Sequence, residues 1–325
     1  MNTSDVIKAY LATRRAQGVQ LRSGARALGQ FARETGNIAL QDVTPSAVAT
    51  FLRGRGALSA SWTTKFRLLA GLYRFALARG YAAASPLPEF KPKLPPQQTP
   101  YVYSHAELQR LLNATDIVSS ACSRLQAMTY RTLLLVLYGA GLRISEAIEL
   151  TVADIELTVA DIDLAERVLT VRNTKFYKTR LVPIGAQLAA ALTAYYAQRS
   201  TLPLPKGQDS AFLCSRSGCR LTYQHVVTMF QRIRSGAGIV CPPGELRPPR
   251  LHDLRHSAAV HRVLAWYRSG KDVQHLLPHL ATYLGHADIA STQRYLQMTP
   301  ELLQEASRRF AAYAQYENLQ EVEHA

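Results

Sequence analysis

The sequence predicts a mainly α-helical protein that carries one small β-hairpin and is divided into two domains. The chain has 325 residues and is 47% hydrophobic, and roughly two domains of about 150 residues, each with a sizeable core, are expected at this length. Apolar residues recur at helical spacing early in the chain, as at Phe66, Leu69, Leu72, Tyr73, Phe75 and Leu77. From Ser104 onward, long helical patterns are interrupted by one strand-like stretch at residues 168–183.

Residues 1–88 are expected to form a basic helical bundle. Residues 1–90 contain twelve Lys or Arg and four Asp or Glu, a net charge of +8. Two helices are predicted to begin at residues 44–46 (Thr-Pro-Ser) and 59–61 (Ser-Ala-Ser), where a hydroxyl can cap the first backbone amides. The charge fits either a solvated surface or a face that binds DNA.

Residues 89–102 are predicted to be a linker, because this region is too rich in proline for a regular helix or a central strand. The prolines are Pro86, Pro88, Pro92, Pro95, Pro96 and Pro100. Residues 103–325 then form the second domain. Its hairpin is predicted from alternation at Val168, Thr170 and Arg172 and from Leu181 and Val182, with Asn173 and Thr174 in the turn.

A tandem repeat lies before the hairpin. Residues 149–155 read ELTVADI, and residues 156–162 repeat the same seven letters. Seven residues rotate an ideal helix by only about 20° from register, whereas an odd insertion exchanges the two faces of a strand. The repeat is therefore expected in helix or loop, as a duplication without a function of its own.

The charge of the whole chain indicates a polyanionic partner. There are 38 Lys plus Arg against 23 Asp plus Glu, a net charge of +15, and 30 of the cations are Arg. The planar guanidinium fits phosphate through two contacts, and nucleic acid is the commonest polyanion. No apolar run approaches the length of about 20 residues that a membrane helix needs, and the N-terminus lacks a signal-peptide pattern. A cytoplasmic location is expected.

The cysteines indicate neither a disulfide framework nor a metal site. Cys122, Cys214, Cys219 and Cys241 are few and scattered for a chain of this length. A zinc site would need two further ligands at finger-like spacing, and none follows closely. No cofactor is predicted.

Separated polar motifs carry the candidate site residues. Arg143 follows an uncharged run at residues 132–142, and taken alone it is best explained by a pair with Glu146, three residues on. His252 and Arg255 are also three residues apart and share one helix face. The remaining candidates are Lys175 and Lys178 in the hairpin turn, His286, and Tyr295.

Taken together, Arg143, Lys175, His252, Arg255, His286 and Tyr295 occur in an order and spacing that resembles the tyrosine recombinase, or phage integrase, family. The resemblance covers most of the chain and implies a helical core-binding domain followed by a catalytic domain. It further implies site-specific DNA cleavage and rejoining through a 3′-phosphotyrosyl intermediate, and four protomers that exchange strands through a Holliday junction.

The chemistry suits these residue types. The two arginines can hold the nonbridging phosphate oxygens, the two histidines can donate hydrogen bonds or move protons, and the phenolic oxygen of Tyr295 can attack phosphorus. The resemblance assigns the general acid to Lys175, with Lys178 as the alternative, and an orienting role to Glu146. A covalent intermediate keeps the bond energy, so the reaction needs neither metal nor nucleotide.

Some interpretations stay open. The segment between Arg255 and His286 is longer than in recombinases that resolve chromosome dimers, and is more similar to those of transposons and other mobile elements. The alternatives to a recombinase are a DNA-binding accessory protein that does not cut and a type IB topoisomerase. An apolar stripe at Leu302, Leu303, Ala306, Phe310 and Tyr313 predicts a C-terminal helix that packs on its own domain or on a neighbour. Spacing rules identify neither the target site nor partner recombinases.

Overall fold

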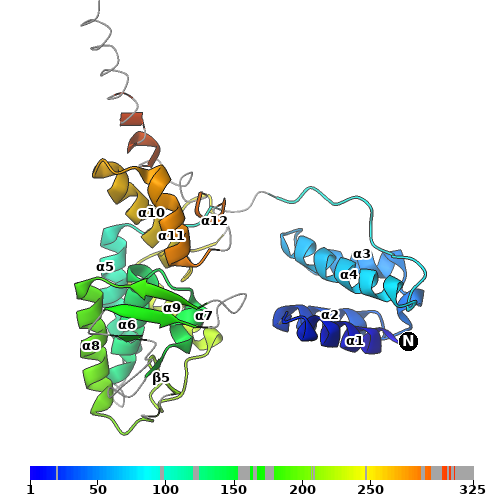
Figure 1. Cartoon of the computed structure of the whole chain (residues 1–325), viewed down its shortest axis with the longest axis horizontal. Coiled ribbons are helices and arrows are strands. Elements are labelled where there is room, and N and C mark those ends of the chain that lie inside the picture. Colours follow the sequence, from blue (N-terminus) through cyan, green and yellow to red (C-terminus); the bar gives the residue numbers. More distant parts are fainter. Residues whose placement is uncertain are drawn as a thin grey trace, which may run out of the picture. The chain divides into compact units, whose positions relative to one another are not determined.

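The computed structural model describes residues 1–19, 21–95, 99–119, 124–152, 162–163, 167–172, 179–205, 207, 209–245, 247–286, 290–293, 302–305, 307–308 and 311. The chain separates into two compact units, residues 1–98 and 99–325. Each unit is built around apolar cores of its own. The described part is mostly helical, with short strands in the second unit alone (Figure 1).

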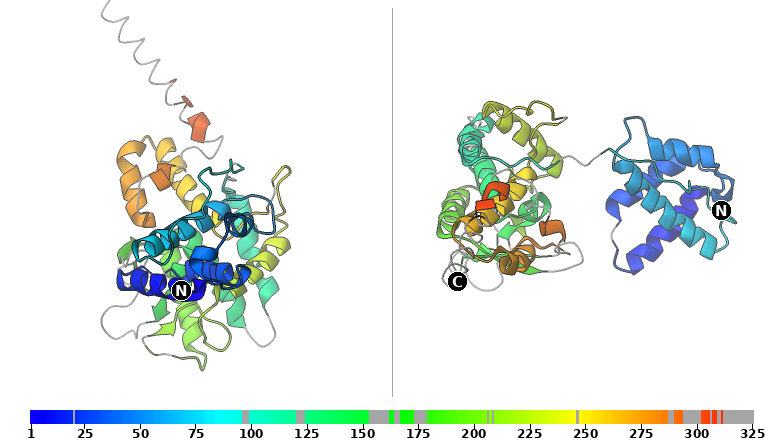
Figure 2. Two further views of the ribbon diagram at one scale, coloured as in Figure 1. Left: turned by 90° about the vertical axis from the view of Figure 1, so that its right-hand side faces the viewer. Right: turned by 90° about the horizontal axis from the view of Figure 1, so that it is seen from above.

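The first unit is a bundle of four helices and one short 3-10 turn. Its elements are α1 (Thr3–Ala16), α2 (Arg22–Glu34), η1 (Leu40–Asp42), α3 (Pro45–Arg53) and α4 (Ser61–Ala78). Helix α4 packs against α1, α2 and α3 and so holds the bundle together (Figure 2). Its buried side chains Leu69, Leu72 and Tyr73 are at most 1% exposed, so the apolar spacing in the sequence marks the core face of this helix.

One of the two predicted hydroxyl caps is confirmed and the other is wrong. The Thr44 hydroxyl accepts a hydrogen bond from the Ala47 backbone N–H, and Pro45 occupies the first turn of α3. Helix α4 begins at Ser61 as expected, but the cap residue is Ala60 and no side chain caps it. The Ser59 and Ser61 hydroxyls lie 2.9 Å apart and bond each other instead.

The proline-rich segment follows the surface of the first unit where the structure describes it. Residues 82–95 contain no helix or strand. Leu87 and Leu94 nevertheless pack on the core of the first unit, whereas Phe90 is 86% exposed. The first residues of the predicted linker therefore belong physically to the bundle.

The described part of the second unit is helical with two small antiparallel sheets. Its helices are α5 (His105–Asn113), η2 (Ala114–Val118), α6 (Arg124–Gly139), α7 (Ile144–Glu149), α8 (Ala186–Ser200), α9 (Tyr223–Gly236), α10 (Asp253–Arg268), α11 (Val273–Leu284) and α12 (Ala290–Gln293). Its strands are β1 (Thr151–Val152), β2 (Ile162–Asp163), β3 (Val168–Val171), β4 (Arg180–Pro183) and β5 (Ser210–Ala211). None of the helices in the described ranges is both long and apolar enough to cross a membrane.

The predicted hairpin is confirmed in its two arms. Strands β3 and β4 pair antiparallel, with Val168 opposite Pro183 and Val171 opposite Arg180. Leu169, Val171 and Val182 face the core and are at most 2% exposed. The sequence missed β2, which adds a third strand beside β3, and the two-stranded ribbon of β1 and β5. These three strands are each only two residues long, too short for alternation to reveal.

The tandem repeat begins in a helix, as expected, because Glu149 is the last residue of α7, but two later parts of it are strands, where the expectation of helix or loop is wrong. The first copy enters β1 at Thr151 and Val152, and the second copy ends at Ile162 in β2. These strands belong to different sheets. An insertion between them therefore leaves the inward and outward faces of each strand unchanged. Residues 153–161 lie outside the described residues.

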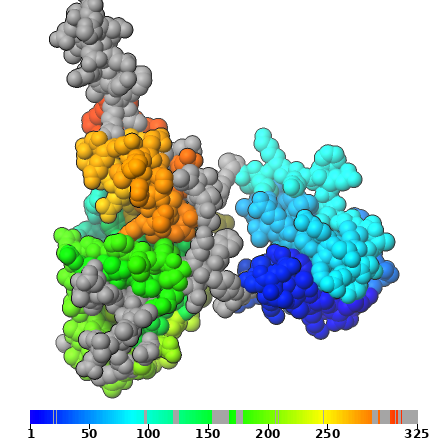
Figure 3. Space-filling view, in the orientation of Figure 1, coloured from blue at the N-terminus to red at the C-terminus, as the bar shows by residue number. Residues whose placement is uncertain are grey.

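Helices α10 and α11 enclose a smaller apolar core beside the main one. Val260, Val263, Leu277 and Leu280 lie in it, each at most 5% exposed, and the two helices form one lobe at the surface of the second unit (Figure 3). Leu302 is also buried in this core, so the predicted C-terminal stripe packs on its own domain at that position. Leu303 is 63% exposed, and Ala306, Phe310 and Tyr313 lie outside the described residues.

Candidate active site

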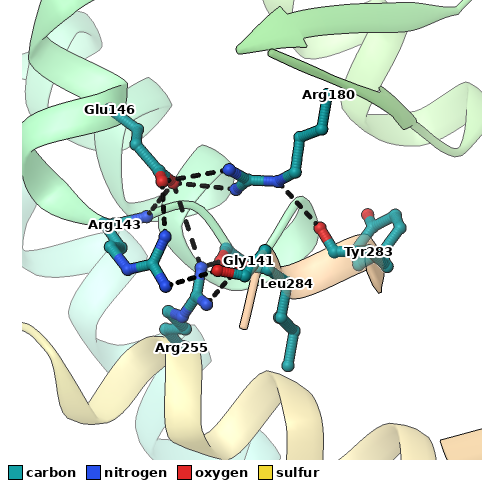
Figure 4. Close-up of polar contacts among 8 residues, drawn as sticks. Gly141, Arg143, Glu146, Arg180, Arg255, Tyr283 and Leu284 are labelled. Carbon is teal, nitrogen blue, oxygen red and sulfur yellow. Dashed lines mark hydrogen bonds and ion pairs between the residues drawn. The ribbon is translucent and has the colours of Figure 1, made fainter. Parts of the chain in front are cut away.

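Three arginines surround one buried carboxylate, that of Glu146 in α7 (Figure 4). Arg143 is the N-cap residue of α7, and the other two come from β4 and α10. Arg143 donates from its guanidinium to Oε1 at 2.7 Å and from its backbone N–H to Oε2 at 2.9 Å. Arg180 of β4 donates to both oxygens, at 3.0 and 2.8 Å. Arg255 of α10 approaches Oε2 to 4.0 Å. The expected Arg143–Glu146 pair is confirmed and is part of a larger cluster.

The arginines keep Glu146 ionised although its side chain is only 6% exposed. Burial by itself would raise the pKa of this carboxyl. The hydrogen bonds from Arg180 and from the Arg143 backbone outweigh burial and lower the pKa from 4.5 to about 2. Glu146 is therefore a permanent anion at neutral pH.

The same three arginines also bind the last carbonyls of α11. The pairs are Arg180 with Tyr283 at 3.0 Å, Arg143 with Gly285 at 2.7 Å, and Arg255 with Leu284. The carbonyls at the end of a helix have no partner within the helix and carry its negative dipole end, so they attract cations. Arg255 also donates to the Gly141 carbonyl. The end of α11 thus fixes all three guanidinium groups.

Gly285 is required by both its backbone and its surroundings. Its φ is +67°, the left-handed conformation that ends α11. A Cβ atom built there would lie 2.8 Å from Nη1 and 2.9 Å from Cζ of Arg180. Any side chain at this position would push against the arginine, and His286 follows directly in the chain.

His252 lies at the start of α10, as its N-cap residue, with Arg255 in the first turn. Arg255, predicted from the helix spacing to lie near His252, affects the pKa of its imidazole. Desolvation by the surrounding protein, followed by the charges of Arg255, Arg250 and Arg143, lowers the pKa of His252 below its ordinary value of 6.5. The imidazole is therefore neutral at neutral pH, able to accept a proton or donate one hydrogen bond.

A second histidine, His256, packs against His252. The two ring centroids are 4.7 Å apart and the rings are nearly perpendicular, at 87°. Burial, then the charges of His252 and Arg255, lowers the pKa of His256 to about 3. His256 is therefore a neutral ring at neutral pH, packed edge-on against His252.

His286 is held by a residue of α12. Its Nδ1 lies 2.7 Å from the Thr292 hydroxyl, and Thr292 is fully buried. Thr292 stands three residues before Tyr295 in the chain. The hydrogen bond therefore ties His286 to the segment that carries the predicted nucleophile.

Four of the six predicted site residues are described, and they converge on the end of α11 and the start of α10. Arg143 and Arg255 bind adjacent carbonyls there, His252 lies within electrostatic range of both, and His286 follows Gly285 directly. Lys175, Lys178 and Tyr295 lie outside the described residues.

Arg180 was not predicted from the sequence to be a member of this cluster. Strand alternation offered a signal: Arg180 stands two residues before the apolar Val182, so the two side chains share one face of the strand, and a cation on the inward face needs an anion. His256 and Thr292 were missed as well. Their roles depend on contacts with His252 and His286 that no spacing in the chain predicts.

Comparison with known proteins identifies the family of the chain that contains this cluster. Residues 102–301, well over half of the chain, match the phage integrase family. This chain belongs to the phage integrase family. One relative is a putative integrase/recombinase of Sinorhizobium fredii, 34% identical over 93% of this chain and 95% of the relative. The tyrosine recombinase XerD of Corynebacterium glutamicum is 30% identical over 83% of each chain.

Solved structures agree with this integrase fold. The Tn1549 transposon integrase, in complex with a circular intermediate DNA, superposes with a TM-score of 0.65 at 16% identity, over 94% of this chain and 99% of that one. A lambda integrase dimer bound to a core site superposes with a TM-score of 0.63 at 16% identity, over 90% and 97% of the chains. The mainly helical fold class with a small sheet is confirmed.

Proposed function

We propose that this integrase-family protein is a site-specific DNA recombinase that cleaves and rejoins DNA during integration, excision or transposition of a mobile element. The cluster of Arg143, Arg255, His252 and His286 around the end of α11 carries this proposal. Several preorganised donors in a partly buried site are what a phosphodiester needs when negative charge develops on its nonbridging oxygens. The net charge of +15 fits a duplex DNA partner.

In the proposed reaction, the Tyr295 phenolic oxygen attacks phosphorus and forms a 3′-phosphotyrosyl bond. The bond from phosphorus to the 5′ oxygen breaks, and this oxygen leaves as a hydroxyl after taking a proton from Lys175, with Lys178 as the alternative donor. Arg143 and Arg255 hold the nonbridging oxygens, and His286 donates a hydrogen bond to one of them. His252, neutral at neutral pH, receives the phenolic proton.

The reverse attack by the 5′ hydroxyl of another strand restores the phosphodiester and frees Tyr295. Four protomers acting together would exchange strands through a Holliday junction, as the solved lambda integrase tetramer bound to a Holliday junction illustrates for that protein. The first unit would serve as the core-binding domain on the duplex. We place the protein in the cytoplasm, together with the DNA on which it acts.

The test is a covalent trapping experiment. Fragments bound from random DNA would first be selected, and a nicked form of the selected site would then be offered to the protein. The nick lets the cleaved end diffuse away, so the wild-type protein is expected to accumulate a DNA adduct that resists denaturation. Tyr295→Phe should give no adduct, whereas the control Tyr223→Phe, at an exposed phenol of α9, should give the wild-type yield.

Each other outcome points elsewhere. An adduct of full yield with Tyr295→Phe would remove Tyr295 as the nucleophile. No adduct with either protein on any selected site would favour a DNA-binding accessory protein. Relaxation of any supercoiled plasmid without preference for a site would favour a topoisomerase.

A further inference from the structure

Arg180 occupies a position at which three parts of the site meet. It opens β4, the return strand of the hairpin that carries Lys175 in the sequence. Its side chain is only 11% exposed, and it lies between Glu146 of α7 and the carbonyl of Tyr283 at the end of α11 (Figure 4).

Each nitrogen of the Arg180 guanidinium donates a hydrogen bond to a protein group. Nη1 and Nη2 donate to the two oxygens of Glu146 at 3.0 and 2.8 Å, and Nε donates to the Tyr283 carbonyl at 3.0 Å. Binding of a phosphate by Arg180 would break a two-point charge-assisted pair with a buried carboxylate, which is costly. Arg180 therefore differs from Arg143, whose side chain is 32% exposed. It differs also from Arg255, which is buried but donates to two neutral carbonyls, those of Gly141 and Leu284, and approaches Glu146 only to 4.0 Å.

We propose that Arg180 is a positioning residue that acts on the reaction through Glu146 and the end of α11. It holds Glu146 in the orientation that receives Arg143, and it holds the helix end from which His286 follows. Because Arg180 is the first residue of β4, opposite Val171, it also sets the turn end of the two strands relative to both. This inference rests on the proposed recombinase function of the same site.

Two features indicate that only an arginine fits this role. A lysine offers one nitrogen in place of a planar fork and cannot bind Glu146 at two points while reaching Tyr283. Gly285 leaves the space that the guanidinium fills, since a Cβ atom there would lie 2.8 Å from Nη1. Gly285→Ala would thus displace Arg180 without changing any charge.

The experiment is a double-mutant cycle of Arg180→Met and Glu146→Gln, read by cleavage of nicked DNA and by thermal unfolding of the full chain. Misplacement of catalytic groups by about 1 Å costs about 100-fold in rate, and each single variant is expected to lose about this much. The double variant should lose no more than about threefold beyond the worse single, because both changes break one linkage. Its fall in melting temperature should likewise be smaller than the sum of the two singles.

Arg199→Met is the matched control. Arg199 is also buried, at 2% exposed, but it lies in α8 and donates to the Pro205 carbonyl. This variant should lower the melting temperature and keep the cleavage rate of its folded fraction within about threefold of wild type. Arg180→Lys, which keeps the charge, and Gly285→Ala provide readings of cleavage if Arg180→Met fails to fold. Both are expected to lose at least about tenfold.

Two results would overturn the inference. If the fold losses in cleavage rate of the two single variants multiply in the double variant, Arg180 acts independently of Glu146 and touches DNA itself. If the losses in melting temperature of the two single variants add in the double variant, Arg180 and Glu146 are not a pair. Failure of the proposed function gives a different result, namely no adduct with the wild-type protein. In that event the unfolding cycle still decides whether Arg180 and Glu146 are coupled.

Discussion

Replacement of Glu146 by Gln should destabilise the second unit by an amount that depends on pH. The pKa of this carboxyl falls from 4.5 to about 2 on folding. At about 1.4 kcal/mol per pH unit, that difference corresponds to about 3 kcal/mol of folding free energy. For a domain of this size, about 3 kcal/mol lowers the melting temperature by roughly 6–12 °C. The side chain is 6% exposed, so little of this is screened by solvent.

The sign of the pH dependence follows from the lowered pKa. The stabilisation is fully present above pH 4.5 and is lost as the pH falls toward about 2, where the folded carboxyl is protonated. Below pH 4.5 the wild-type protein therefore approaches the Glu146→Gln variant, which has no charge to lose. The gap in melting temperature between them should be constant between about pH 7 and about pH 5 and should narrow steadily toward about pH 3.

The assay is thermal unfolding of both proteins across this pH range, with Glu149→Gln as the control. Glu149 ends the same helix and pairs with Arg220, but its side chain is 67% exposed, so its removal should cost less than about 1 kcal/mol. A gap for Glu146→Gln that stays constant down to about pH 3 would refute the argument, because the loss would then reflect side-chain shape rather than charge. Equal stability of variant and wild type at neutral pH would refute it too.

Three further predictions follow from other parts of the site. Thr292→Val should slow cleavage of nicked DNA about tenfold, because His286 loses the hydroxyl that orients its ring. Thr292→Ser, which keeps the hydroxyl, should retain most of the wild-type rate. Equal cleavage rates for the two variants would contradict this. Vanadate or sulfate should raise the melting temperature of the wild-type protein more than that of Arg143→Met, because the cluster is preformed for an oxyanion. Deletion of one ELTVADI copy should leave cleavage intact, since the remaining copy supplies the same residues to β1 and β2, and complete loss of cleavage would refute that view.

The sequence predicted the parts of this fold that local physics determines. The Arg143–Glu146 pair followed from a spacing of three residues in a helix, and the arms of the hairpin followed from alternation in β3 and β4. The cap at Thr44 could be predicted because Thr44 carries a hydroxyl and the next residue, Pro45, favours the first turn of a helix. The cap predicted at residues 59–61 failed, because Ala60 is the cap residue and the Ser59 and Ser61 hydroxyls bond each other.

The contacts that organise the site join distant parts of the chain, and local rules could not supply them. Arg180 meets the carbonyl of Tyr283, which is 103 residues away, and Arg255 meets that of Gly141, which is 114 residues away. A helix end attracts cations in general. Which cations reach the helix end depends on how α7, β4 and α10 pack, and local sequence patterns do not predict that packing.

The charge of the cluster explains why a buried carboxylate is kept in a site built for an anion. Arg143, Arg180 and Arg255 bring three positive charges against the single negative charge of Glu146, an excess of two. Without Glu146 the arginines would repel one another in a poorly hydrated space. With it they are held apart at fixed positions, and the excess remains for a ligand. A phosphodiester brings one negative charge and gathers more on its oxygens as phosphorus is attacked, so the cluster matches the transition state better than the ground state. In the proposed reaction, Glu146 and Arg180 would fix the arrangement of charge, and Arg143 and Arg255 would meet the phosphate.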